Sequence, residues 1–238
     1  MLRVDFITLF PEMILQAVGH SMIKRAREAE LVEIRVVNPR DFATDKHHTV
    51  DDKPFGGGPG MLMMAPPIDA ALISLSLPPD VTVLMPDPTG RALKQGDIEH
   101  WSQQGHVVIL CGHYEGIDDR IRQKWNAEPI SIGDYVLTGG ELPALVMADA
   151  IIRTLPGVLG CADSLEIDSH AEGLLSAPQF TRPEVWDDRP IPDVLKSGDH
   201  VARERWKRKI ALQITRDRRP DLFAQARLAK GDSDLLSS

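Results

Sequence analysis

The feature that most constrains the fold of this 238-residue chain is a continuous apolar run, Val107-Val108-Ile109-Leu110-Cys111. A strand with one face in water alternates apolar and polar residues, so an unbroken apolar run indicates a strand covered on both faces. Further strands are expected at Leu2 to Thr8, Leu31 to Val37, Val81 to Met85 and Pro129 to Ile132. Helical patterns separate them, and this alternation predicts an α/β fold with a mainly parallel sheet.

Two of the expected helices carry specific predictions. The first begins at Pro11 and is expected to run unbroken to about Arg27. The second, from Glu141 to about Leu155, is apolar nearly all round. A helix of this kind is buried on most sides, either by its own domain or by a second copy of the chain. Arg153 at its far end is either a structural ion-paired residue or an anion-stabilising group beside a site.

The stretch from Ser131 to Leu145 places Gly133, Gly139 and Gly140 among β-forming residues. It predicts either a backbone that faces a ligand or a tight hairpin. Ligands of parallel sheets bind beyond the carboxyl ends of the strands. Two other strand ends, after Met85 and at 112–116, are also rich in Gly or Pro and poor in cationic side chains. Together these turns favour a pocket for an adenosine-type ligand or a sulfonium cation, with Glu115 as its charge, over a polyphosphate.

Charge is distributed unevenly along the chain, whose formal net charge is -8. Residues 1–171 contain 14 Lys and Arg against 24 Asp and Glu, whereas 172–238 contain 13 against 11. Basic residues concentrate within 203–219, on a helix expected from His200 to Thr215 with Asp199 as its cap. The cluster is either a directional patch for a polyanion or a solvated helix face. A polar segment, 156–183, precedes this small, basic, helical region.

Several classes of protein are disfavoured by the sequence. No apolar run approaches the roughly 18 residues needed to span a bilayer, and the first residues lack a signal-peptide pattern. Cys111 and Cys161 are too few for a disulfide framework or for a structural zinc site without a set of histidines. We therefore expect a cytoplasmic protein with no membrane association and no metal site.

Six motifs occur in one order along the chain: Lys53 to Met61 (KPFGGGPGM), Cys111 to Asp118 (CGHYEGID), Ser131 to Pro143, Pro156 to Gly160, Ala171 to Leu175 and Thr181 to Trp186. With Asp5 to Pro11 (DFITLFP), they give a chain that resembles the bacterial tRNA (guanine-N1)-methyltransferases over nearly its whole length. It departs from that pattern at Asp87-Pro88-Thr89-Gly90, where the family usually has Ser-Pro-Gln-Gly, and at His113, where the family more often has arginine.

The resemblance implies a fold, a reaction and an assembly. The family belongs to the SPOUT class, whose α/β domain contains a deep C-terminal trefoil knot that holds S-adenosyl-L-methionine. The expected layout is a cofactor-binding knotted domain at 1–160, an interdomain linker at 161–175 and a small all-helical tRNA-binding domain at 176–238. The expected activity is methylation of N1 of the guanosine immediately 3′ of the anticodon, position 37, by a homodimer whose active sites are shared between chains.

The resemblance also implies roles for individual residues. Asp168 would be the general base, and Arg153 would stabilise charge at guanine O6. Basic residues of the C-terminal helix would grip the anticodon arm of tRNA: Arg203, Arg205, Lys207, Arg208 and Lys209. The pocket for S-adenosyl-L-methionine would consist of Met85, Pro86, Pro88, Gly112, Tyr114, Glu115, Gly116, Ser131, Ile132, Gly133, Asp134, Tyr135, Val136, Leu137, Gly139, Gly140 and Pro143.

Two alternatives remain open at this point. A related knotted methyltransferase acting on ribosomal RNA or on a ribose hydroxyl would share most of these motifs. A non-catalytic RNA-binding module could retain the same cleft. A proton-accepting Asp168 favours the base nitrogen as the methylated atom, because guanine N1 carries a proton at neutral pH and needs a base to become a nucleophile.

Overall fold

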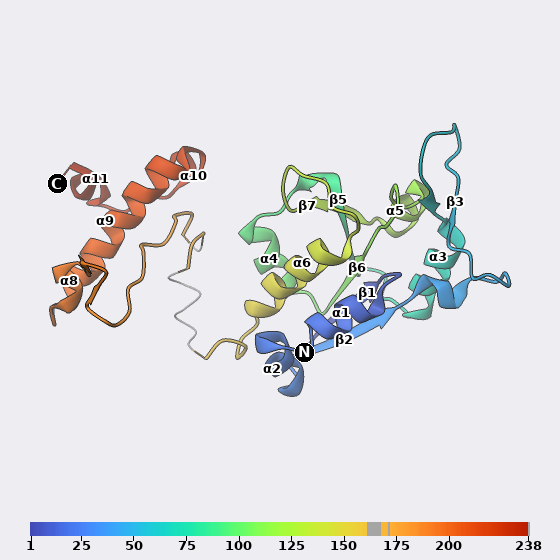
Figure 1. The fold of residues 1–238 in the computed structure, drawn as a ribbon, viewed down its shortest axis with the longest axis horizontal. Coiled ribbons are helices and arrows are strands. Elements are labelled where there is room, and N and C mark those ends of the chain that lie inside the picture. Colours follow the sequence, from blue (N-terminus) through green and yellow to red (C-terminus); the bar gives the residue numbers. More distant parts are fainter. Residues whose placement is uncertain (161–167, 171, 238) are drawn as a thin grey trace. The chain divides into compact units, whose positions relative to one another are not determined.

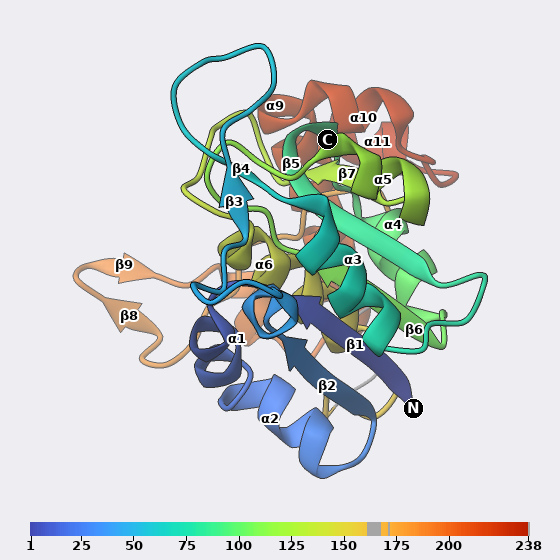
Figure 2. The same cartoon turned by 90° about the vertical axis from the view of Figure 1, so that its right-hand side faces the viewer.

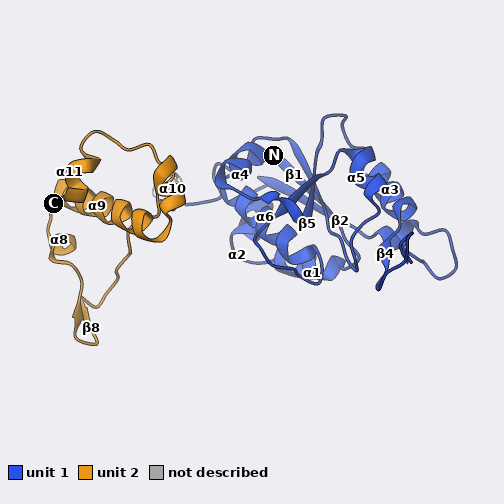
Figure 3. Cartoon of the chain, turned by 90° about the horizontal axis from the view of Figure 1, so that it is seen from above, with its two compact units in different colours: residues 1–160 blue, residues 161–238 orange. Residues whose placement is uncertain are grey.

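The computed structural model describes residues 1–160, 168–170 and 172–237. The chain divides into two compact units, Met1–Gly160 and Cys161–Ser238, which are coloured separately in Figure 3. No helix in the described residues is long and apolar enough to cross a membrane.

The first unit is built on a five-stranded sheet whose order is β2-β1-β6-β5-β7. The strands are β1 (Leu2–Ile7), β2 (Val32–Val37), β5 (Thr82–Ala92), β6 (His106–Leu110) and β7 (Glu128–Ser131). Every neighbouring pair is parallel. Strand β6 is the central strand, and Val107 to Leu110 are fully buried. The predicted α/β fold with a mainly parallel sheet is confirmed.

Helices cover both faces of this sheet (Figures 1 and 2). On one face, Val4, Phe6 and Ile109 pack with residues of α1 (Pro11–Ala17), α2 (Ser21–Glu28), α4 (Gln95–Ser102) and α6 (Glu141–Arg153). On the other face, Ile7 and Val108 pack with α3 (Ala65–Ser74), α5 (Asp119–Trp125) and the short 3-10 helix η1 (Pro39–Phe42). Helix α6 contacts α1, α2 and α4, so it lies among the helices of the first face.

The helix expected from Pro11 to about Arg27 is wrong as a single element, because the structure forms two helices. Helix α1 ends at Ala17 and α2 begins at Ser21. Gly19 lies in the break, and glycine is about 1 kcal/mol less favourable than alanine inside a helix. Breaking the helix here allows both Val18 and Ile23 to be buried in the same core. Tertiary packing therefore overrides a helical pattern that continues through the glycine.

The long segment between β2 and α3 is not wholly irregular. After η1, strand β3 (Asp51–Asp52) pairs antiparallel with β4 (Leu62–Met63), and the two enclose the glycine-rich loop 53–61. Met63 in turn forms a parallel bridge with Ile117. The loop is therefore attached through its base to the turn that follows β6.

The second unit is mostly helical in its described residues, with α8 (Asp193–Lys196), α9 (His200–Arg218), α10 (Pro220–Gln225) and α11 (Asp232–Ser237). The side chain of Asp199 accepts a hydrogen bond from the amide of Ala202 at 3.0 Å, which confirms the predicted cap of α9.

The expectation of an all-helical region is wrong at one place. Strands β8 (Val185–Trp186) and β9 (Arg189–Pro190) pair antiparallel. Asp187 and Asp188 both have positive φ, at 52° and 56°, as a two-residue hairpin turn requires. Strands of two residues are too short to show an alternating pattern, and the Asp-Asp turn lacks the usual glycine.

Candidate active site

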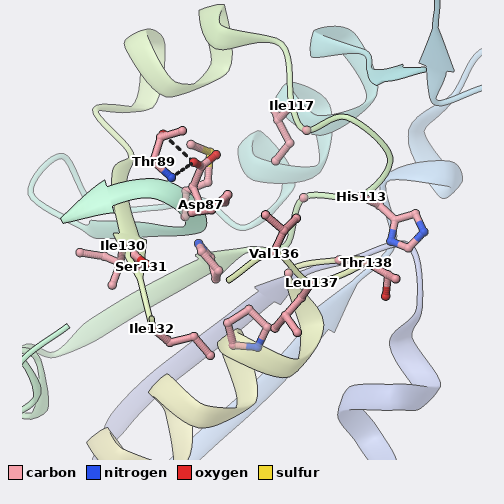
Figure 4. A pocket seen from close by; sticks show the side chains of 18 of the residues that line it. Asp87, Thr89, His113, Ile117, Ile130, Ser131, Ile132, Val136, Leu137 and Thr138 are labelled. Atoms are coloured by element: carbon pink, nitrogen blue, oxygen red, sulfur yellow. Dashed lines mark hydrogen bonds between the residues drawn. The ribbon is translucent and has the colours of Figure 1, made fainter. Parts of the chain in front are cut away.

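Three segments of the first unit meet beyond the central strands and enclose a pocket of about 310 Å³. One is the irregular part of β5 at 85–89, the second is the turn 112–117 after β6, and the third is the segment 130–140 with the start of α6. Figure 4 shows Asp87 and Thr89 on one side of the pocket, Ile117 on another, and Val136 and Leu137 facing them. The three turns that the sequence singled out therefore lie side by side.

The pocket contains nearly all of the residues predicted for the methyl donor. Asp134 is the exception: it is exposed and does not line the pocket. The sequence prediction missed six lining residues, which are Asp87, Thr89, His113, Ile117, Ile130 and Thr138. Each of them is adjacent in sequence to a predicted residue, so extending each motif by one position would have found them. For every residue that lines the pocket, contact with a ligand remains a prediction.

The turn predicted at 87–90 is an irregularity within a longer strand. Strand β5 pairs with β7 on both sides of a register shift between Pro86 and Arg91. Within the shift, the carboxylate of Asp87 accepts hydrogen bonds from the amide and the hydroxyl of Thr89, at 2.7 and 2.6 Å. The edge of the pocket is thus fixed by a local side-chain turn.

The segment that begins at Ser131 forms the opposite wall. It is not a hairpin, because no strand follows β7 among the described residues 132–140 before α6 begins at Glu141. The hydroxyl of Ser131 hydrogen-bonds to the backbone of Gly133. Further on, the amide of Gly140 donates to the carbonyl of Gly112 at 2.7 Å. A Cβ on Gly140 would lie 2.8 Å from the Cα of Cys111, so only glycine permits this close approach of two backbones.

The turn 112–117 is held by the segment that follows the glycine-rich loop. The amide of Glu115 donates to the carbonyl of Met61 at 2.9 Å, and the amide of Met63 donates to the carbonyl of Gly116 at 2.9 Å. On the other side, the guanidinium of Arg40 donates to the hydroxyl of Tyr114 at 3.3 Å. The floor of the pocket is therefore anchored to the long segment 38–64.

Charged groups around the pocket are few. Its lining includes the acidic Asp87 and Glu115 and no lysine or arginine among the described residues. Burial and the nearby charge of Glu141 raise the pKa of the Cys111 thiol well above its usual value, so this buried sulfur stays protonated and unreactive. Within the described part of the chain, no group of three His, Cys, Asp or Glu side chains is placed to hold a metal ion.

A second hollow, of about 770 Å³, lies at the amino ends of β5 and β7, and Leu77, Thr82 and Trp125 are among its lining residues. Its lysine is already engaged, because Lys124 pairs with Asp69 at 2.6 Å. Although this hollow is larger, ligands of parallel sheets bind at the carboxyl ends of the strands. The smaller pocket is therefore the better candidate.

The two predicted catalytic residues belong to different units. Arg153 is the last residue of α6 and is half-buried. Asp168, also half-buried, precedes a turn in which the amide of His170 donates to the carbonyl of Leu174 at 2.7 Å. Most of the predicted linker, 161–167 and 171, lies outside the described residues.

The predicted RNA-binding residues of α9 differ in their surroundings. Arg208 is tied to Asp232, at 2.8 Å between Nη2 and Oδ2, and to Glu172 at 2.7 Å. Asp232 is 3% exposed, so this pair is part of the packing of the unit. Lys207 pairs with Glu204 at 2.8 Å. Among the described residues, no ion pair engages Arg203, Arg205 or Lys209, and these are the stronger candidates for contact with a polyanion.

Comparison with known proteins decides the family. The family model described as tRNA (Guanine-1)-methyltransferase TrmD matches residues 2–225. The chain belongs to this family. It is 47% identical over 241 residues to a tRNA (guanine-N(1)-)-methyltransferase of Moorella thermoacetica, covering 99% of this chain and 95% of that protein. Proteins of the same name are 44% identical in Staphylococcus haemolyticus (100% and 97% covered) and 46% identical in Pseudomonas putida (99% and 95% covered). The resemblance based on six motifs is confirmed.

Proposed function

We propose that this protein transfers a methyl group from S-adenosyl-L-methionine to N1 of the guanosine immediately 3′ of the anticodon, position 37, in tRNA. Family membership supports the reaction class and the tRNA substrate. The observation that carries the proposal is the pocket itself, because three turns far apart in sequence bring together almost all of the residues expected to hold the methyl donor. A tRNA substrate also fits a cytoplasmic location.

The lining of the pocket fits the proposed donor. Backbone groups of Gly112, Gly116 and Gly133 can approach a ligand closely, and Ile132, Val136 and Leu137 offer apolar contact for an adenine. The lack of lysine and arginine in the described lining disfavours a polyphosphate, whereas Glu115 suits a cation. When bound, S-adenosyl-L-methionine supplies an electrophilic methyl group on a positively charged sulfur.

The chain supplies two groups for the nucleophile. Asp168 accepts the proton of guanine N1, and Arg153 donates hydrogen bonds to O6, where negative charge develops. A carboxylate is a weak base for the N1 proton, so the cation at O6 is needed to make that proton more acidic. General-base assistance of this kind contributes about 10²- to 10⁴-fold.

The assembly belongs to the same proposal. Helix α6 is not covered on all sides within this unit, because Leu142 and Val146 are 54% and 50% exposed. Helix α1, which contacts α6, has an exposed Met13 (43%), and Phe10 just before it is 40% exposed. An apolar face of this kind fits a second copy of the chain. In a homodimer, the site is completed by both chains. Sedimentation of Val146→Lys, with Ile73→Lys on α3 as the matched exposed control, tests this.

The trefoil knot is also proposed. The segment 131–140 hydrogen-bonds to Leu93 at its start, through the carbonyl of Ser131, and to Gly112 at its end. It thus runs from the edge strand β7 past the turn that follows the central strand β6 and into helix α6. This path supports a threaded chain.

A single-turnover assay with an unmodified tRNA transcript tests the function. The expected product is N1-methylguanosine at the position immediately 3′ of the anticodon, mapped by mass spectrometry of nuclease fragments. Asp168→Asn should lower the rate at least 10²-fold, whereas Asp188→Asn, an exposed acid of the same unit, should not. Failure to form this product, or full activity of Asp168→Asn, would contradict the proposed reaction or its base respectively.

A further inference from the structure

A buried carboxylate and a histidine face each other beside the pocket. Glu141, the first residue of α6, is 2% exposed, and its Oε1 accepts a hydrogen bond from the hydroxyl of Thr8 at 2.8 Å. Its Oε2 lies 4.0 Å from Nδ1 of His113. His113 lines the pocket, and Figure 4 shows it at the same end as Thr138. Nδ1 of His113 is buried and has no hydrogen-bond partner within the described residues.

The packing holds this pair in place. A Cβ on Gly139 would lie 2.5 Å from Oε2 of Glu141 and 2.6 Å from Nδ1 of His113, so this position admits only glycine without separating the two groups. The imidazole packs against the rings of Phe10 and Tyr114, at centroid distances of 4.8 and 5.0 Å. Its backbone amide donates to the sulfur of Met63 at 3.2 Å. The separation between Glu141 and His113 is therefore set by the surrounding structure.

Few other charges act on this pair. From β6, the Cys111 thiol is neutral, because burial and the charge of Glu141 raise its pKa. From the pocket turn, the hydroxyl of Tyr114 accepts from Arg40, and Glu115 is the other acidic group of that turn. The segment between β1 and α1 presents the uncharged Thr8 and Phe10. The net charge at this end of the pocket therefore depends on whether His113 is protonated.

We propose that Glu141 and His113 make the pocket discriminate between the cationic methyl donor and its neutral demethylated product. This inference rests on the proposed function. With a neutral imidazole, the carboxylate is uncompensated and favours a positively charged occupant. With a protonated imidazole, the two charges cancel and the preference weakens. The carboxylate of Glu141 does not itself line the pocket, but it lies directly behind Gly139 and His113, which do. A charge this close to a partly enclosed pocket acts on an occupant more strongly than it would in water.

Calorimetric titration of the full chain tests the proposal. S-adenosyl-L-methionine and S-adenosyl-L-homocysteine are titrated separately at about pH 5.5 and 8.5, which bracket the range where imidazole changes charge. The dissociation constant of S-adenosyl-L-homocysteine divided by that of S-adenosyl-L-methionine should be about three- to tenfold larger at the higher pH. Both ligands carry an amino group that titrates, so the same ratio in His113→Gln provides the correction. His100→Gln, an exposed residue of α4, is the matched control.

The variants give distinct outcomes. His113→Gln should reduce the pH dependence of the ratio to the part that the ligands' own amino groups cause. Glu141→Gln should lower the preference for the cation at both pH values. Because His113 is partly exposed, its variant remains informative if Glu141→Gln does not fold, which thermal unfolding reveals. The inference is overturned, and the proposed function is untouched, if the ratio does not change with pH in the wild type. The same holds if the ratio changes with pH equally in the wild type and in His113→Gln. If neither ligand binds the folded wild type, the proposed donor is wrong and the inference falls with it.

Discussion

The pocket of the first unit and helix α9 of the second are built in different ways. The pocket depends on the path of the backbone, since its walls meet where Gly140 packs directly on Cys111 and Gly112. Helix α9 instead presents separate charged side chains, such as Arg205 and Lys209, on a regular helix. A pocket formed by the backbone is sensitive to added volume, whereas a surface formed by side chains responds to loss of charge. Variants of each kind test this distinction.

The largest effect is expected from a change at Arg153, the last residue of α6, and it should be seen in the reaction rate. Arg153→Ala should lower kcat about 10²- to 10³-fold, because the proposed reaction places this cation at the negative charge that develops on O6. Binding of the donor should not change, since Arg153 does not line the pocket. Arg122→Ala, in an exposed pair with Asp119 on α5, is the control. Weakened donor binding with normal kcat would show that Arg153 serves the pocket and not the reaction.

Each unit also contains a buried acid paired with arginine, and the two should differ in stability. Asp5 is fully buried and accepts from Arg35 at 2.8 and 2.7 Å, with Nε2 of His106 at 2.7 Å. Asp5→Asn should cost about 3–5 kcal/mol of unfolding free energy, because it leaves buried partners uncompensated. Asp232→Asn should cost about 1–3 kcal/mol, because Arg208 keeps Glu172. Urea unfolding measures both, and equal losses would contradict this ranking.

The buried Asp5 also makes the stability of the first unit depend on pH. Burial raises the pKa of Asp5, but hydrogen bonds and charges from Arg35 and His106 outweigh it and hold the pKa below its usual value. A carboxyl whose folded pKa is depressed stabilises the fold above its unfolded pKa of about 3.9, and the gain is lost as pH falls through the folded value. The difference in unfolding free energy between wild type and Asp5→Asn should therefore shrink below about pH 4.

A glycine pair tests the backbone-built pocket. Gly140→Ala should destabilise the first unit by about 1–3 kcal/mol and weaken donor binding, because the new methyl group meets Cys111. Gly96→Ala, in α4, has nothing within 4 Å of the added carbon and should be neutral or stabilising by up to about 1 kcal/mol. Thermal unfolding and calorimetry compare the two. If the two variants have the same stability and the same affinity for the donor, the close packing of Gly140 on Cys111 does not determine the shape of the pocket.

The smallest effect is expected on α9. Arg205→Ala and Lys209→Ala should each weaken tRNA binding a few-fold and reduce its salt dependence by about one counterion, with unchanged stability. Arg208→Ala should instead destabilise the second unit through Asp232. Filter binding across salt concentrations and urea unfolding separate the two outcomes. Lys230→Ala, near the C-terminus, is the control.

The features that could be predicted from the sequence are those that depend on residues close together in the chain. The apolar run of β6 predicted a buried parallel strand, and Asp199 predicted the start of α9, because each depends on neighbouring residues. The three turns of the pocket followed from strand ends in a parallel sheet. The family resemblance then supplied the roles proposed for Asp168 and Arg153, which no local pattern indicates.

Features decided by distant partners were not predicted. The pairing of Arg208 with Asp232 depends on a residue 24 positions away, so five basic residues looked equivalent in sequence. The break at Gly19 depends on burying Val18 and Ile23 against the sheet. Glu141 and His113 come close because the start of α6 and the turn after β6 meet only in the folded chain.

A crystal structure of the full chain with S-adenosyl-L-methionine tests the central claim most directly. The donor is expected in the pocket formed by segments 85–89, 112–117 and 130–140, in contact with the backbone of the central turns. A donor bound elsewhere, such as in the hollow beside Leu77 and Trp125, would contradict it.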